Sequence, residues 1–293
     1  SEDGSFMENF SRLILPRRCL WKIQINPYLY DHHLEGSAVF PAAEAAIELA
    51  RVVRNNFPQA SVINLTEASF PRFLSLPENA EEVTVSVNIE RGDGAGIAAS
   101  LLSSIASKTG NIRRTVEHAR MQFSPVAENH CAAHSFNCPE KLEGKSINVP
   151  AAAIYRDLVP FGRAYRNISG DVTVSPGGAL GYIYGGNAEA DDELLGSPFP
   201  FDAVLQMACI WAQRYTDIVP FPVGFAQRII FQKTRKQIEY LGRVEPVAVA
   251  SQPLIFNAWI FDQQGALCEA TQGIRMRDVS GGRMKPPEWI KLS

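Results

Sequence analysis

The sequence has little net charge, few cysteines and no long apolar run. Its 28 Lys and Arg residues nearly balance its 31 Asp and Glu residues, and the formal charge of −3 leaves no basic surplus for binding nucleic acid. The five cysteines form no Cys-x-x-Cys pair, and an odd, scattered set is untypical of a secreted disulfide framework. No apolar run approaches the roughly 18 to 20 residues that cross a bilayer. We therefore expect a cytoplasmic protein with neither nucleic acid nor membrane as a partner.

The residues that are present fit a globular chain with a large core. The 293 residues are 46% hydrophobic, enough for one large domain or two small ones. Residues 1–6 read as an expression remnant before a natural start at Met7. A helical pattern that is apolar on nearly all sides runs from Pro41 to Asn56 and predicts a buried helix. Strand-length segments follow it as an antiparallel meander, at residues 61–73, 82–90, 95–107 and 111–124.

The second half of the chain repeats this plan after a segment without sustained periodicity. A second apolar helix is expected at residues 201–215. Strands are expected around it, at residues 165–174, 179–184, 224–232, 237–244, 253–262 and 266–276. A long buried helix wrapped by a curved antiparallel sheet is the hot-dog arrangement. The sequence therefore predicts an α+β double hot-dog fold, with an N-terminal half at 7–135, a connecting segment at 136–149 and a C-terminal half at 150–293.

The densest polar motif lies directly before the first helix and reads His32-x-x-x-Gly36-x-x-x-x-Pro41. A histidine can accept a proton near neutral pH, and a glycine lets a ligand approach the backbone. The proline starts a helix whose amide end favours developing negative charge. The motif predicts a base beside an oxyanion site, and the spacing to Gly36 favours His32 over its neighbour His33.

A second motif opens the second helix, where Asp202 and Gln206 are four residues apart on one helical face. Apolar surroundings should raise the pKa of the Asp202 carboxyl, so that it stays protonated and can act as an acid. Gln206 could then fix its orientation. Taken alone, Asp202 is better explained as an N-terminal helix residue that the helix dipole favours.

With one motif before each buried helix, the sequence resembles the polyketide synthase dehydratase family, whose domains are double hot-dog folds. His32, Gly36 and Pro41 match the His-x-x-x-Gly-x-x-x-x-Pro motif of that family. Asp202 and Gln206 match its Asp-x-x-x-Gln/His motif. Both the order and the spacing of the motifs are preserved.

The resemblance covers nearly the whole chain from Trp21 onward, including the segment Tyr155–Tyr165, which is similar to the Tyr-x-x-Leu and Gly-x-x-Tyr region of the family. Two departures stand out. Arg166-Asn167 replaces the family's Gly-Pro after the tyrosine, and Ser197-Pro198 replaces the His-Pro that commonly precedes the aspartate. They suggest a free-standing or divergent member with its own substrate specificity.

The resemblance implies elimination of water from a 3-hydroxyacyl thioester on the phosphopantetheine arm of an acyl carrier protein, without metal or organic cofactor. His32 would remove the C2 proton as general base, and Asp202 would protonate the departing 3-hydroxyl as general acid. The amide of Gly36 and the helix start at Pro41 would face the thioester oxygen. Tyr165 is a candidate for a further substrate contact, although a buried, internally bonded tyrosine explains it as well.

Several alternatives remain open. The same acid/base pair could move a double bond or direct a cyclisation, and a non-catalytic acyl-binding module could retain the fold. Two His and two Cys within His130–Cys138 match no standard zinc spacing and are interpreted as part of the connector. The basic segment Lys233–Lys236 is a candidate docking site for an acidic carrier protein. A monomer and a homodimer are equally compatible with the sequence.

Overall fold

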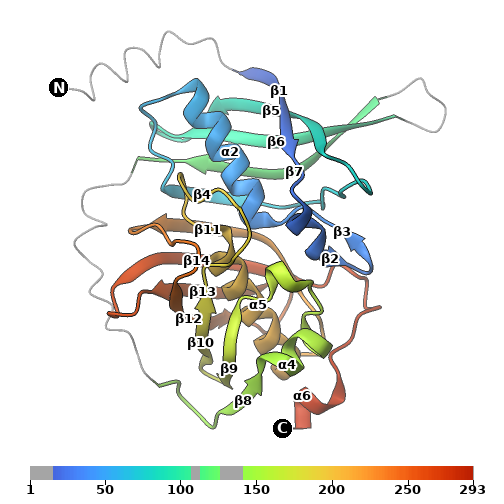
Figure 1. Cartoon of the computed structure of the whole chain (residues 1–293), viewed down its shortest axis with the longest axis vertical. Coiled ribbons are helices and arrows are strands. Elements are labelled where there is room, and N and C mark those ends of the chain that lie inside the picture. Colours follow the sequence, from blue (N-terminus) through green and yellow to red (C-terminus); the bar gives the residue numbers. More distant parts are fainter. Residues whose placement is uncertain (1–15, 107–112, 126–140, 293) are drawn as a thin grey trace.

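A computed structural model describes residues 16–106, 113–125 and 141–292 of the chain (Figure 1). Met7 and the His130–Cys138 tract lie outside the described residues, so the start and the connector interpretation stay predictions. No helix in the described ranges is long and apolar enough to cross a membrane.

The N-terminal half consists of a long helix, α2 (Ala42–Asn56), against an antiparallel sheet. The strands of this half are β1 (Arg17–Gln24), β4 (Asn64–Ser69), β5 (Glu82–Arg91), β6 (Ile97–Ala106) and β7 (Arg113–Phe123). Before α2 the chain forms the short helix η1 (Pro27–Asp31) and a small hairpin of β2 (His33–Leu34) and β3 (Ser37–Ala38). The helix is predicted from the sequence within one residue at its start.

The C-terminal half has the same plan around α5 (Pro198–Tyr215), as Figure 1 shows. Its strands are β8 (Ile147–Pro150), β9 (Ile168–Ser175), β10 (Gly178–Tyr184), β11 (Phe221–Ile230), β12 (Glu239–Ala248), β13 (Leu254–Phe261) and β14 (Leu267–Arg277). Short helices are α4 (Ala151–Ala153), η2 (Ile154–Leu158), η3 (Arg163–Tyr165) and α6 (Glu288–Leu292). Residues 147–149, expected in the connector, instead begin β8, which pairs with β9; the wider division into halves stays a prediction.

The two halves share one antiparallel sheet, which has twelve strands within the described residues, in the order β1-β5-β6-β7-β4-β11-β14-β13-β12-β10-β9-β8. The predicted meander is wrong at β4. This strand does not pair with β5 but lies between β7 and β11, with Leu65 opposite both Phe123 and Arg228. Because both of its edges are paired, β4 joins the halves into a continuous sheet.

Each long helix packs on the concave face of its part of the sheet, which confirms the predicted α+β double hot-dog fold (Figure 1). Every residue of α5 from Pro198 to Gln213 is buried, because its side chains are apolar almost all round. Gly242 on β12 allows the close approach, since a Cβ there would lie 3.1 Å from a methyl carbon of Val204 on the helix. The helices α2 and α5 also contact each other, and one of the two motifs lies at the start of each.

Candidate active site

His32 is held by the backbone that leads from η1 into the β2–β3 hairpin. Its N–H donates to the Leu29 carbonyl at 3.2 Å, and its carbonyl accepts from the Val39 N–H at 3.0 Å. The ring Nδ1 lies 3.0 Å from the Val39 carbonyl oxygen. Since a carbonyl oxygen can only accept, Nδ1 carries the proton and Nε2 keeps its lone pair. Burial lowers the pKa of His32 to about 4, so the ring is neutral at pH 7.

Asp202 lies in the first turns of α5, a helix that begins with a serine cap and two prolines. The Ser197 hydroxyl accepts from the Phe199 N–H at 3.4 Å and donates to the Gly185 carbonyl at 2.7 Å. Ser197, one of the departures from the family pattern, is therefore the N-cap of this helix. Only 5% of Asp202 is exposed, and burial raises the pKa of its carboxyl to about 7.

The two halves bring these residues into contact: His32 Nε2 lies 3.6 Å from Asp202 Oδ1. Aromatic rings pack against the imidazole from the second half, with centroid separations of 4.5 Å for Phe161 and 5.1 Å for Tyr165. A neutral base and a buried acid thus face each other in a mostly apolar setting. Such a pair can take a proton from one atom and give one to its neighbour.

A backbone brace fixes the His32 loop against the second half. The carbonyl of Asp31 accepts from the Gly162 N–H at 2.8 Å, and its carboxylate accepts from the Ala164 N–H, also at 2.8 Å. A Cβ on Gly162 would overlap the Asp31 carboxyl group, so this position requires glycine for space. The residue next to His32 is therefore anchored across the interface between the halves.

Gln206 connects the acid to its surroundings. Its Nε2 donates to Asp202 Oδ2 at 2.7 Å and to the Tyr165 carbonyl at 2.9 Å. Its Oε1 accepts from the Tyr155 hydroxyl at 3.0 Å, and that hydroxyl accepts from the Ile168 N–H at 2.9 Å. Because Gln206 donates to Oδ2, a proton on the carboxyl resides on Oδ1, the oxygen that faces His32.

The pair opens into a cavity of about 300 Å³. His32, Asp202, Gln206 and Gly36 are all on its wall. The rest of the wall is mainly apolar and comes from both halves, including Phe40, Ala45, Phe70, Leu205 and Val219. Its size and composition suit an acyl chain rather than a charged metabolite. Within the ranges described, no three His, Cys, Asp or Glu side chains are arranged to hold a metal ion.

Gly36 and Pro41 occupy the two ends of the segment between His32 and α2. Gly36 has φ +82° in the two-residue turn of the β2–β3 hairpin, and the space where a Cβ would point is open. Pro41 is the N-cap of α2, and its carbonyl accepts from the Ala45 N–H at 2.9 Å. Gly36 borders the cavity, whereas Pro41 lies behind its wall.

Tyr165 is placed differently from a substrate contact. It is fully buried behind His32 and is not part of the cavity wall. Its carbonyl, not its hydroxyl, serves the site by accepting from Gln206. The hydroxyl has no hydrogen-bond partner among the described residues. Tyr165 therefore supports the imidazole by packing, and the backbone-carbonyl bond expected as the alternative is absent from its hydroxyl.

Sequence reasoning missed the groups that orient the pair. Tyr155 was noted for its likeness to the family but not as a partner of Gln206. The role of the Val39 carbonyl could not be predicted from the sequence, because every residue has a backbone oxygen. The role of the Asp31 carboxylate could not be predicted either, because its partner lies in the other half of the chain. His118, which also lies on the cavity wall, is a lone histidine in a strand and gives no signal in the sequence.

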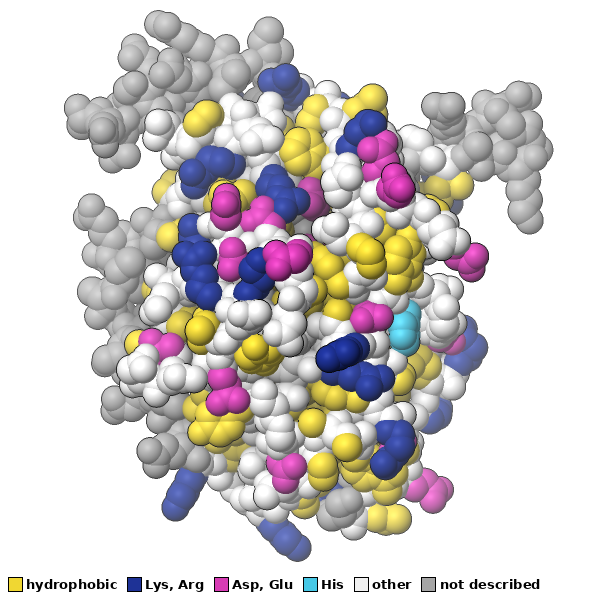
Figure 2. Space-filling model, in the orientation of Figure 1, with side chains coloured by type: hydrophobic (Ala, Val, Ile, Leu, Met, Phe, Trp, Pro, Cys, Tyr) yellow, Lys and Arg dark blue, Asp and Glu magenta, His cyan; other side chains and the backbone are white. Residues whose placement is uncertain are grey.

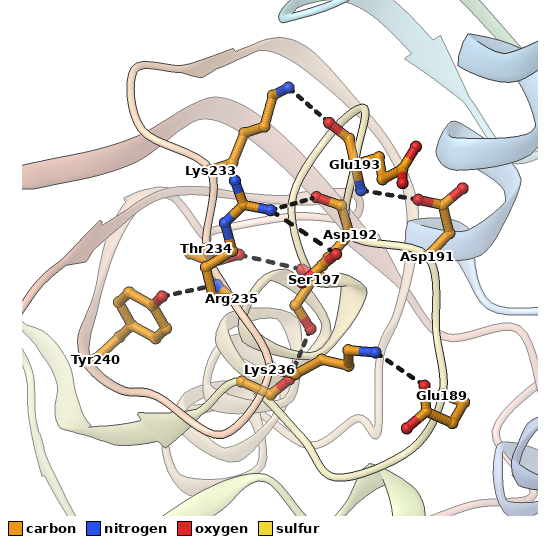
Figure 3. Close-up of polar contacts among 11 residues, drawn as sticks. Glu189, Asp191, Asp192, Glu193, Ser197, Lys233, Thr234, Arg235, Lys236 and Tyr240 are labelled. Carbon is orange, nitrogen blue, oxygen red and sulfur yellow. Dashed lines mark hydrogen bonds and ion pairs between the residues drawn. The ribbon is translucent and has the colours of Figure 1, made fainter.

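The basic segment Lys233–Lys236 does not form a free positive patch. Its side chains contact the acidic segment 189–193, as Figure 3 shows. Lys233 donates to the Glu193 carbonyl (2.6 Å), Arg235 lies 3.8 Å from Asp192, and Lys236 lies 3.0 Å from Glu189. On the face shown in Figure 2, basic and acidic side chains likewise lie side by side. The segment stabilises the loop before α5, and its charge is compensated within the chain.

Two family models match this chain. A model described as polyketide synthase dehydratase domain matches residues 15–104, and one described as polyketide synthase dehydratase N-terminal domain matches residues 133–286. No curated protein matches the sequence.

Solved dehydratase domains have the same fold at low sequence identity. The domain of RzxB from Pseudomonas fluorescens gives a TM-score of 0.66 at 13% identity, covering 89% of this chain and 94% of that chain. The domain from the CurJ module of curacin polyketide synthase gives 0.66 at 17% identity, covering 95% and 96%. The domain from the CurF module gives 0.65 at 18% identity, covering 89% and 93%.

Proposed function

Because this chain belongs to the polyketide synthase dehydratase family, we propose that it eliminates water from a 3-hydroxyacyl thioester carried by an acyl carrier protein, with His32 as base and Asp202 as acid. Family membership supports dehydration in polyketide biosynthesis; the residue roles and the carrier-bound substrate are our proposal. The observation that carries it is the contact of 3.6 Å between a neutral imidazole and a buried carboxyl at the wall of an apolar cavity.

The reaction needs one proton removed from C2 and one supplied to the hydroxyl on C3, on the same side of the acyl chain. Nε2 of His32 takes the proton from C2, and the electron pair of that C–H bond becomes the C2–C3 double bond. The C3–O bond breaks as Oδ1 of Asp202 gives its proton to the leaving hydroxyl, which departs as water. Positioned groups of this kind each contribute about 10² to 10⁴-fold.

The charge states before and after the step favour this assignment. Burial favours the neutral form of both groups, because it lowers the pKa of His32 and raises that of Asp202. After elimination an imidazolium faces a carboxylate at the same short separation, and the two charges stabilise each other in the buried site. The Asp202 carboxylate also retains the hydrogen bond from Gln206.

The remaining motif residues position the thioester and the acid. The open turn at Gly36 offers a backbone amide at the cavity wall, where the thioester oxygen gathers negative charge during C2 deprotonation. Pro41 starts α2, and Ala42 and Ala45 in the first turn of this helix line the cavity, where the amide end of a helix favours negative charge. Gln206 orients Asp202, and Tyr165 supports His32. A cytoplasmic setting and the choice between monomer and homodimer stay predictions of the sequence.

Mass spectrometry of a 3-hydroxyacyl chain on a carrier protein or a pantetheine mimic tests the proposal. The wild type should remove the mass of one water, and His32→Ala and Asp202→Asn should not. His33→Ala is the matched control, because it deletes the neighbouring imidazole and leaves the pair intact. An unchanged mass with a shifted retention time indicates double-bond movement or cyclisation instead, and binding without any product indicates an acyl-binding module.

A further inference from the structure

One face of α5 forms a row of side chains along the cavity wall. Asp202, Leu205, Gln206 and Cys209 all line the cavity. Residues three, four and seven positions apart lie on the same side of a helix, so these four side chains follow one another along the helix axis. Among the described residues that line the cavity, Cys209 is the last one from α5. The row therefore runs for two helical turns, from the proposed acid to a small side chain.

The part of the cavity beside Cys209 is closed by buried residues. Leu158 and Val219 also line the cavity, and all three residues are buried. Gln213, which is not part of the wall, donates to the Cys209 sulfur at 3.4 Å and to the Leu158 carbonyl at 2.9 Å, so it ties α5 to the end of η2. Burial raises the pKa of the Cys209 thiol to about 12, so the side chain is uncharged at pH 7 and acts as a small apolar group.

Another part of the cavity wall is open to solvent. Glu35 and Gly36 line the cavity and are exposed. An arm that is attached to a carrier protein has to enter from solvent, so the thioester arrives at this side. In the proposed function the thioester oxygen then faces Gly36, C2 lies at His32, and C3 lies at Asp202. The carbons beyond C3 continue along the row of side chains that ends at Cys209.

We propose that Cys209 limits the length of the acyl chain, to about eight carbons beyond C3. This inference rests on the proposed function. The helix advances about 10.5 Å over the seven residues from Asp202 to Cys209. An extended alkyl chain advances about 1.25 Å for each carbon–carbon bond. A chain that follows the row therefore reaches Cys209 when the 3-hydroxyacyl group has about eleven carbons in all.

The limit has a definite effect on the rate. Below it, each added methylene buries more apolar surface, so kcat/KM should rise with chain length by at most about fourfold for each methylene. Beyond it, the next carbons meet the side chain of Cys209 and the buried residues around it. Forcing extra methylenes into a packed wall is unfavourable, so kcat/KM should fall by about fivefold or more.

The test measures kcat/KM for a series of saturated, unbranched 3-hydroxyacyl chains on pantetheine, lengthened by one carbon at a time from 3-hydroxybutyryl to 3-hydroxypalmitoyl. Cys209→Met adds two heavy atoms at the end of the row and should shorten the longest efficient chain by about two carbons. Cys209→Ala removes the sulfur and should lengthen it by about one carbon. Cys209→Ser is the matched control, because the side chain keeps its approximate size and should keep the wild-type limit.

A shift of the length limit does not result from a folding defect, because a folding defect lowers kcat/KM for every chain alike. The inference is overturned if the wild type shows no limit within the series, or if the limit stays in place in Cys209→Met and Cys209→Ala. It is also overturned if Cys209→Met slows all lengths equally, the result expected if the pantetheine arm lies along the row. These outcomes leave the proposed dehydration intact. If the wild type dehydrates no chain of the series, the proposed function is refuted, and the length limit with it.

Discussion

The substitution Gln206→Leu tests how much the orientation of Asp202 contributes, because the acid itself stays in place. The leucine keeps the approximate size of the side chain but removes the N–H that donates to Asp202 Oδ2 at 2.7 Å. This hydrogen bond favours the ionised carboxylate, so its loss raises the pKa of Asp202 above the wild-type value of about 7. The alkaline limb of kcat/KM, where the acid loses its proton, should move to higher pH.

The size of both effects follows from the bonds that are lost. A hydrogen bond to a charged group contributes about 1.5–3 kcal/mol, and one pKa unit corresponds to about 1.4 kcal/mol, so the limb should move by about one to two units. The Tyr165 carbonyl also loses its donor, and the Tyr155 hydroxyl loses its acceptor while it retains the hydrogen bond from the Ile168 N–H. At about 1–3 kcal/mol for each buried group left unpaired, the free energy of unfolding should fall by about 2–6 kcal/mol.

Two further variants serve as controls for Gln206→Leu. For each variant, the pH–rate profile gives the position of the alkaline limb and urea denaturation gives the free energy of unfolding. Gln213→Leu removes a buried amide from the same helix, one that donates to the Leu158 carbonyl at 2.9 Å, and should lower stability without moving the limb. Gln206→His keeps a donor for the carboxylate and should restore the limb toward the wild-type position. An alkaline limb that stays in place or moves down in Gln206→Leu would refute the assigned role of Gln206.

Three further predictions concern the same fold. Wild-type kcat/KM should rise with pH as His32 loses its proton, with a pKa of about 4, and fall as Asp202 ionises, with a pKa of about 7; activity that continues to rise well beyond neutral pH would contradict the assignment. Glu269→Ala leaves a fully buried guanidinium without its ion pair and should lower the free energy of unfolding by about 3–5 kcal/mol in urea, whereas a loss under about 1 kcal/mol would show that the pair is dispensable. Gly162→Ala should lower both Tm and kcat, because its Cβ overlaps the Asp31 carboxyl that anchors the loop of the base; an unchanged Tm would mean that the loop yields.

Helices and strands with a clear hydrophobic periodicity were predictable from the sequence, whereas the pairing of the strands was not. The apolar surface of α5 and the hairpin turns at Pro176-Gly177 and Asp262–Gly265 are local features, and the structure confirms the elements beside them. The position of β4 between β7 and β11 depends on contacts between segments more than 50 residues apart, such as Leu65 with Phe123. Hydrophobic periodicity does not show which other strand pairs with each edge of β4.

The candidate site was likewise predictable only in part. The spacing of the two motifs identified His32, Asp202 and Gln206, which the fold brings into one cluster. The brace between Asp31 and the Gly162 segment was not predictable, because it joins residues from different halves, and its donors are backbone N–H groups. Charge was misleading in isolation: Lys233–Lys236 is basic in sequence but is compensated by the acidic segment before α5.

Arg166 and Asn167, which replace the Gly-Pro of the family pattern, hold the loop that packs against the base. Arg166 Nε donates to the Phe161 carbonyl at 2.8 Å, and Asn167 Nδ2 donates to the Ala164 carbonyl at 2.7 Å. Both bonds close the segment whose Phe161 and Tyr165 rings pack on His32. A Gly-Pro pair has no side-chain donors and could form neither bond. These substitutions therefore change how the loop is fixed while the acid/base contact is kept, so a difference in substrate choice is to be sought on the cavity wall and not in the pair itself.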